Sequence, residues 1–204
     1  MFAGGTVIDE KGGVGSLLWR AKGDPSRRWL VFCWSVLFAY RALRPFLGQK
    51  KAIAVLQTAL SRQFKRQRQA YMNARFGITQ ERPEEAFERI SQNYKARGES
   101  LFGPRFTYVQ AIQDQRRSHT HITRCLFNDF FRTHGAPEVT SLFCALDTVW
   151  ADELNQPRYK AHFERPTTLA AGDDACRFQF SRAEGEAQAP LQADTVAKRQ
   201  PGLS

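Results

Sequence analysis

The chain has 204 residues, of which 42% are hydrophobic and 12% aromatic. This composition excludes a wholly disordered protein and suits one globular domain with a buried core. Its four cysteines, at positions 33, 125, 144 and 176, are too few and too scattered for a disulfide scaffold or a zinc ribbon. We therefore expect reduced thiols and a cytoplasmic protein.

The net charge of +10 is concentrated near the amino terminus. Residues 1–75 contain 14 Lys and Arg against 3 Asp and Glu, whereas residues 76–204 contain 16 and 17. A basic region of this kind could meet nucleic acid or anionic lipid. No nucleic-acid recognition motif accompanies the charge. We therefore expect a solvated basic helix face, no specific nucleic-acid binding and at most weak contact with a membrane surface.

Residues 1–26 are rich in glycine and lack apolar periodicity, which predicts a flexible basic lead. The apolar run at 29–40 follows, but its twelve residues fall short of the about 20 that span a bilayer. The preceding Ser-Arg-Arg is similar to an export signal, yet no cleavage motif follows it. The run therefore predicts a buried helix rather than a membrane span or an export signal.

Residues 50–75 repeat apolar side chains at helical spacing with Lys and Arg between them, which predicts a long amphipathic helix ending at Gly77. Pro83 and two glutamates then begin another helix, because proline and acidic residues suit a first turn. We expect this second helix to end at Gly98.

The second half of the chain has a different residue pattern. Residues 105–114 and 118–125 carry β-branched and aromatic residues with partial alternation, which predicts two strands. A short helix to Gly135 and another from Pro137 to about Leu154 are expected next. Residues 159–172 and 175–182 flank a Gly-Asp-Asp turn, the pattern of an antiparallel hairpin. The polar segment 183–204 predicts a disordered tail.

This order of elements predicts an α+β fold, in which N-terminal helices pack on an antiparallel sheet of about four strands with two inserted helices. One domain is expected over residues 27–182. Its helical part is 27–98, and its sheet and motif-bearing part is 99–182. The oligomeric state is left open by the sequence, a homo-oligomer included.

Two pairs of cysteine and aspartate are candidates for chemistry. Cys125 and Asp129 are four residues apart, and Cys144 and Asp147 are three apart, so each pair shares one helix face. Cys125 lies where a strand passes into a helix, a position that favours a thiolate. Cys176 begins the last strand. The alternative is that these cysteines are small buried hydrophobic residues, a common role for free cysteine.

The sequence favours no metal site. His119 and His121 lie on one side of a strand and could join Cys125 around zinc, but no short Cys/His knuckle accompanies them. There is also no P-loop, dinucleotide fingerprint, GxSxG or HExxH motif. The sequence therefore requires no cofactor, and the identity of any cofactor stays unknown.

The stretch "ITRCLFNDFFRTHGAPEVTSLFCALD", followed by "FERPTTLAAGDDACRFQF", resembles the L-2-amino-thiazoline-4-carboxylic acid hydrolase family. The resemblance covers residues 100–182 and, more loosely, 29–97. The matching motifs place family residues at Thr123, Arg124, Cys125, Gly135, Pro137, Glu138, Cys144, Asp147, Gly172, Cys176 and Phe178. One position departs from the pattern: family members often have Asp after the last cysteine, where this chain has Arg177.

The resemblance implies hydrolysis of the small cyclic isothiourea 2-amino-thiazoline-4-carboxylate to N-carbamoyl-cysteine. Cys125 would be the nucleophile, because it begins a helix, and Asp147 would handle protons, because it lies among core residues. Cys144 and Asp129 complete the expected catalytic set. Arg124 would bind the substrate carboxylate, and Cys176, Thr123 and His121 complete the expected binding set.

A second hypothesis is a non-catalytic domain that binds a small molecule in the same cysteine-lined pocket, as a sensor or an accessory protein. The two hypotheses share one structural test. Cys125, Cys144, Asp147 and Cys176 must converge on a single cleft, or the enzyme hypothesis loses most of its support.

Overall fold

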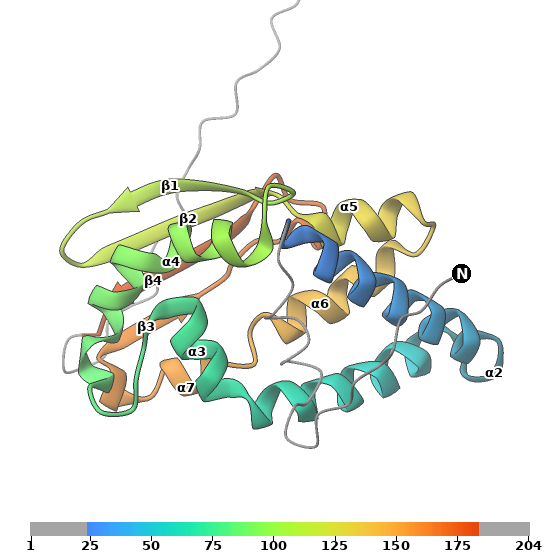
Figure 1. Ribbon diagram of the computed structural model, residues 1–204, viewed down its shortest axis with the longest axis horizontal. Helices are drawn as coiled ribbons and strands as arrows, with labels where there is room; N and C mark the ends of the chain where they lie inside the picture. Colours follow the sequence, from blue (N-terminus) through green and yellow to red (C-terminus); the bar gives the residue numbers. More distant parts are fainter. Residues whose placement is uncertain (1–23, 184–204) are drawn as a thin grey trace, which may run out of the picture.

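A computed structural model describes residues 24–183, which combine long helices with one antiparallel sheet (Figure 1). The helices are α2 (Ser26–Arg66), α3 (Arg68–Phe76), α4 (Ala86–Phe102), α5 (Leu126–Thr133), α6 (Thr140–Leu146) and α7 (Ala151–Leu154). The strands are β1 (Thr107–Gln113), β2 (Arg117–Arg124), β3 (Ala161–Glu164) and β4 (Cys176–Arg182). The predicted α+β class, with N-terminal helices and a four-stranded antiparallel sheet, is confirmed. The predicted lead and tail fall almost wholly outside the described residues.

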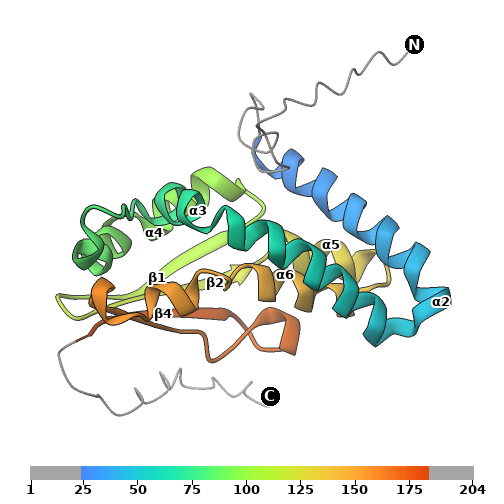
Figure 2. The ribbon, with the colours of Figure 1, turned by 90° about the horizontal axis from the view of Figure 1, so that it is seen from below.

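Helix α2 is a bent rod whose two arms diverge from Gly48 (Figure 2). Gly48 has φ 73° and ψ 165°, a backbone conformation that L side chains rarely adopt, and Pro45 lies just before it. The predicted helices over 29–40 and from residue 50 onward are thus the two arms. The second prediction was wrong about continuity, because the helix breaks at Gln67 and restarts as α3. Its predicted end is confirmed, since Gly77 follows Phe76 with φ 78°.

The first arm of α2 is buried along one face only, whereas the apolar run at 29–40 predicted a buried helix: Val31 and Phe38 on the other face are 67% and 62% exposed. Cys33, Leu37 and Tyr40 are fully buried, and the Trp29 indole Nε1 donates to the Leu101 carbonyl at 3.0 Å. Ser26, expected in the flexible lead, instead begins the helix and is fully buried, with its hydroxyl donating to the Phe102 carbonyl. Helix α2 therefore includes one residue that the sequence assigned to the lead.

Helix α4 runs to Phe102 and packs across β1, β2 and β4. Its predicted end at Gly98 was wrong, because Gly98 lies inside the helix and the chain leaves it at Gly103 with φ +81°. Gly98 is present for space rather than for a turn: a Cβ there would lie 2.8 Å from both the Arg75 guanidinium and the Tyr108 ring. The glycine thus allows α4 to approach these two side chains closely.

The sheet has the order β1-β2-β4-β3, and all neighbouring strands are antiparallel. Tyr108, Ile122 and Cys176 lie side by side across three strands. Because side chains alternate along a strand, these three residues share one sheet face. The helices gather on this face (Figure 2). The predicted hairpin around Gly172 is confirmed by the pairing of β3 with β4.

The segment inserted between β2 and β3 holds three short α-helices rather than the two predicted. Helix α5 ends before Gly135 as expected. The predicted helix from Pro137 to Leu154 is instead a 3-10 turn, then α6, four turn residues and α7. The Thr148 hydroxyl donates to the Ala145 carbonyl, a local bond that competes with a regular helix. Asp147 therefore caps the end of α6 instead of lying inside a helix.

Candidate active site

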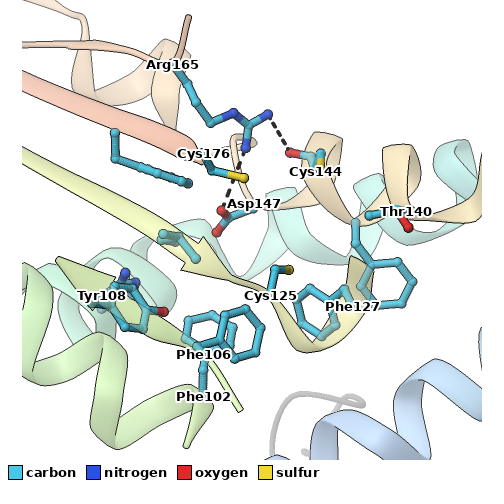
Figure 3. A pocket seen from close by; sticks show the side chains of 14 residues that line it. Phe102, Phe106, Tyr108, Cys125, Phe127, Thr140, Cys144, Asp147, Arg165 and Cys176 are labelled. Carbon is cyan, nitrogen blue, oxygen red and sulfur yellow. Dashed lines mark hydrogen bonds and ion pairs between the residues drawn. The ribbon is translucent and has the colours of Figure 1, made fainter. Parts of the chain in front are cut away.

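A small cavity lies where the sheet meets α3, α5 and α6 (Figure 3). The cavity volume is about 30 Å³, which is room for one or two water molecules. Its lining is mostly aromatic and aliphatic, with a few polar side chains among them. The lining residues are Arg75, Phe102, Phe106, Tyr108, Ile122, Cys125, Phe127, Thr140, Phe143, Cys144, Asp147, Arg165, Cys176 and Phe178.

Three of the four cysteines reach this cavity, each from a different element. Cys125 is the N-cap of α5, Cys144 lies in α6, and Cys176 is the first residue of β4, where its sulfur accepts from the Leu169 N–H at 3.3 Å. Cys33 lies in α2 and does not line the cavity. All four thiols are free. The convergence that distinguishes a site from scattered core cysteines is therefore present.

Burial governs the acidity of these thiols. It raises the pKa of Cys144 to about 12 and raises the pKa of Cys176. For Cys125, burial raises the thiol pKa well above its usual value, and the N–H groups of Asn128 and Phe127 at the start of α5 only partly oppose it. Cys125 has the predicted position at a helix start, but burial opposes the thiolate expected there.

Asp147 is the carboxylate of the cavity. Its Oδ1 accepts a hydrogen bond from the Tyr71 hydroxyl at 3.3 Å, and its Oδ2 lies 3.8 Å from Nη1 of Arg165. Burial raises the pKa of Asp147, while Arg165, Arg75 and Tyr71 oppose that rise. The predicted direction of the shift is thus present, although Asp147 is at a helix end. A carboxyl group whose pKa is raised toward neutrality can both accept and return a proton.

Two arginines give the cavity a positive charge. Arg75 is buried among aromatic rings, with its guanidinium carbon 3.8 Å from the centre of the Tyr94 ring, and it forms no ion pair within 4 Å among residues 24–183. Arg165, just after β3, donates to the Cys144 carbonyl at 3.1 Å and faces Asp147. Two guanidinium groups and one carboxylate leave one net positive charge around an apolar space.

Four residues predicted for the site lie outside the cavity. Arg124 and Asp129 pair with each other at 3.2 Å, with 57% and 48% of their side chains exposed. Asp129 points outward because only the opposite face of α5, with Phe127, Phe130 and Phe131, is buried. The proposed substrate contact through Arg124 and the catalytic role of Asp129 therefore lose their geometric basis.

Thr123 is exposed, and it alternates with Ile122, which faces the cavity. His121 lies on the sheet face opposite Ile122 and Cys176, so strand alternation directs it away from the cavity. Both residues were expected in the binding set, and the strand register overturns that expectation. Among the residues described, no group of three or more His, Cys, Asp or Glu is arranged to hold a metal ion.

Arg177, the departure from the family pattern, also lies outside the cavity. It follows Cys176 on β4 and is directed to the other sheet face, where its guanidinium donates to both carboxylate oxygens of Asp174 at 2.9 and 3.0 Å. The substitution therefore changes a surface ion pair near the hairpin turn and leaves the cavity lining unaltered.

Four polar side chains at or beside the cavity were not predicted from the sequence: Tyr71, Arg75, Tyr108 and Arg165. A signal for Arg75 exists, because Tyr71, Met72, Arg75 and Phe76 share one helical face, so an arginine stands where a core residue is expected. Arg165 has no comparable pattern. It follows a short strand among polar residues, and only tertiary contacts with the end of α6, at the Cys144 carbonyl and Asp147, bring it to the cavity.

A match to a known protein family identifies the family of the chain. The family model for L-2-amino-thiazoline-4-carboxylic acid hydrolase matches residues 32–180. The chain belongs to this hydrolase family. The match includes all 14 residues of the cavity lining. No curated protein and no solved structure matches the chain.

Proposed function

We propose that the protein hydrolyses 2-amino-thiazoline-4-carboxylate, or a closely similar small cyclic isothiourea acid, to an N-carbamoyl-cysteine-like product. The observation that carries the proposal is the convergence of Cys125, Cys144, Cys176 and Asp147 on one cavity in a chain of this hydrolase family. Because such chemistry needs reduced thiols, we place the protein in the cytoplasm.

The charges of the cavity suit a ligand with one carboxylate. Arg75 and Arg165 outnumber Asp147, so a monoanion would neutralise the site. Arg165 is the group we assign to the ligand carboxylate, because its hydrogen bond to the Cys144 carbonyl can be exchanged for a bidentate pair. The space of about 30 Å³ is too small for a nine-atom acid at rest, so Arg165 must swing away from Asp147 as the ligand is admitted. Arg75 is fixed by its aromatic neighbours and supplies a permanent positive charge.

The proposed reaction begins with Asp147 taking the Cys125 proton as the sulfur attacks carbon 2 of the ring. The Cys125 S–C2 bond forms, the ring C2–S bond breaks, and Asp147 returns the proton to the departing ring sulfur. Water then adds to carbon 2. One of its hydrogens goes to the imine nitrogen and the other to Cys125, which leaves as a thiol, and the oxygen becomes the carbonyl of the product. One water molecule is consumed.

The raised pKa of the Cys125 thiol, caused by desolvation in the cavity, favours one alternative within the same site, in which Asp147 activates water directly and Cys125 only shapes the cavity. The test is mass-spectrometric detection of product from the thiazoline acid with the purified chain. Under the thiol mechanism, we expect Cys125→Ser to lower kcat by about 1000-fold or more. Near-normal turnover in that variant would select the water mechanism. Under either mechanism, Asp147→Asn should lower kcat by about 100-fold with little change in KM.

The surface pair of Arg124 and Asp129 supplies matched controls, because it repeats the chemistry of Arg165 and Asp147 outside the cavity. Arg124→Gln and Asp129→Asn should turn over normally, whereas Arg165→Gln should raise KM. If the unaltered chain bound the thiazoline acid without turning it over, the hypothesis of a non-catalytic binding domain would replace that of an enzyme. Absence of both binding and turnover would reject this substrate class.

A further inference from the structure

The outer face of α2 exposes large apolar side chains, one of which, Trp34, also packs against Phe130 of the neighbouring helix α5. Val31, Trp34 and Phe38 follow one another at helical spacing, and Phe46 and Leu47 lie at the bend. Phe46 is 87% exposed and Phe38 62% exposed. The Trp34 and Phe38 rings stack at 5.5 Å, so the patch is continuous along the first arm. We call these five residues the outer apolar patch.

Helix α2 itself supplies only positive charge around this patch. Helix α2 has nine Lys and Arg and no Asp or Glu among its 41 residues. Arg41, Arg44, Lys50 and Lys51 are exposed on both sides of the bend, which forms one end of the molecule, away from the free end of the sheet (Figures 1 and 2). An apolar face with basic flanks is typical of a helix that lies in the headgroup region of an anionic membrane.

We propose that the outer apolar patch and the basic bend of α2 dock the protein on an anionic lipid surface. Phe38, Phe46 and Leu47 would enter the headgroup boundary, while Arg44, Lys50 and Lys51 pair with lipid phosphates. This inference is independent of the proposed catalytic function, because the patch shares no residue with the cavity.

The helix lies on the membrane in this proposal and does not cross it. By length and composition α2 could span a bilayer, with a mean hydropathy of 1.4 over its most apolar 18 residues. However, Cys33, Leu37 and Tyr40 on its inner face are fully buried against the rest of the domain. Spanning would require these side chains to leave the core and would place Arg41 and Arg44 near lipid chains.

A second copy of the chain is a poorer occupant of the patch. A symmetric contact places the same helix on both sides, which would bring two surfaces with nine positive charges and no acidic residue together. Like charges facing each other across an interface oppose association. Anionic lipid instead supplies the missing negative charge together with an apolar phase.

The experiment is co-sedimentation of the full chain with vesicles of phosphatidylcholine alone, or of equal parts phosphatidylcholine and phosphatidylglycerol, at physiological ionic strength. We expect binding only to the anionic vesicles. Phe38→Ser and Phe46→Ser should each weaken it by about tenfold, since each removes one ring from the headgroup boundary. The matched control is Val109→Ser, an exposed apolar residue on β1 far from the patch, which should bind as the unaltered chain does.

Several outcomes would overturn the proposal. Binding that both phenylalanine variants keep would reduce the contact to charge alone. Absence of binding to any vesicle would reject the lipid surface as the partner. If the chain also formed a concentration-dependent dimer that Phe46→Ser abolishes, the patch would be assigned to a second copy. Displacement from vesicles by double-stranded DNA at the same ionic strength would point to nucleic acid. Protein that stays with the membrane after alkaline carbonate washing would indicate a span.

Discussion

Gly98 is the position where the fold and the candidate active site are most tightly coupled. It lies inside α4 and is fully enclosed. The Cβ of an alanine there would lie 2.8 Å from Nη1 of Arg75, 2.8 Å from Cζ of Tyr108 and 2.9 Å from Cε1 of Tyr108. All three distances are well below van der Waals contact, so at least one neighbour must shift.

Two opposing effects set the stability of Gly98→Ala. Alanine favours a helix interior over glycine by about 1 kcal/mol. Overpacking a close-packed site costs about 1–3 kcal/mol. The larger cost applies here, because Arg75 is 2% exposed and Tyr108 5% exposed, so neither can move into solvent. We expect a net loss of about 1–2 kcal/mol in the free energy of unfolding. For a chain of this size, that corresponds to a fall in Tm of roughly 2–8 °C.

Urea unfolding followed by far-ultraviolet circular dichroism measures this loss. Ala96→Gly, an exposed position on the same helix, is the control, because it reports the alanine–glycine difference without the contact and should cost about 1 kcal/mol. Gly98→Ala should also reduce turnover, since both displaced side chains line the cavity. A Gly98→Ala variant as stable as the unaltered chain, alongside a destabilised Ala96→Gly, would refute the close packing of α4 on Arg75 and Tyr108.

Two further predictions concern the pH dependence of stability, each measured by urea midpoints. Burial raises the pKa of Asp147, so its contribution is greatest below the ordinary value of 3.8 and is lost as pH rises through the raised value. Asp147→Asn should therefore be more stable than the unaltered chain at pH 7, with no advantage below pH 3.8. Glu153 has the opposite sign: burial opposes ionisation, but hydrogen bonds from Arg158 and Tyr159 and the charge of Arg68 hold its pKa below 4.5. Its contribution is present above pH 4.5 and lost as pH falls through the lowered value. Glu153→Gln should thus cost about 1–2 kcal/mol at pH 7 and progressively less in acid. A destabilised Asp147→Asn at pH 7, or a Glu153→Gln penalty independent of pH, would contradict the assigned environments.

The sequence predicted the elements whose signals are local. Alternation identified the strands, and the apolar run at 29–40 and the helical spacing from residue 50 identified the two arms of α2 as helical. Glycine was a less reliable marker of helix ends, because it has more than one structural role. Gly77 and Gly135 follow the ends of helices with positive φ, as expected. Gly98 serves close packing instead, a role that depends on residues far away in the chain and has no local pattern.

The same distinction separates the predicted site residues that reach the cavity from those that do not. Spacing placed Cys125 and Asp129 on one side of a helix, but only the packing of Phe127, Phe130 and Phe131 decides which side is buried. Asp129 consequently pairs with Arg124 at the surface. The family motifs predicted that Cys144, Asp147 and Cys176 lie together, and all three line the cavity. Arg165 also lines it, but no sequence motif indicated this, because only tertiary packing places it there.

Two breaks in helical structure, both missed by the periodicity of the sequence, bring the charged groups of the cavity together. The break at Gln67 separates α3 from α2, and α3 then directs Tyr71 and Arg75 toward the cavity. The turn after Leu146 leaves Asp147 at the carboxyl end of α6, where the helix dipole disfavours a negative charge and adds to the effect of burial. A continuous helix through residue 147 would remove that dipole contribution. The irregular backbone at these two points therefore influences the pKa of Asp147, and both proposed mechanisms depend on the protonation of this carboxyl group.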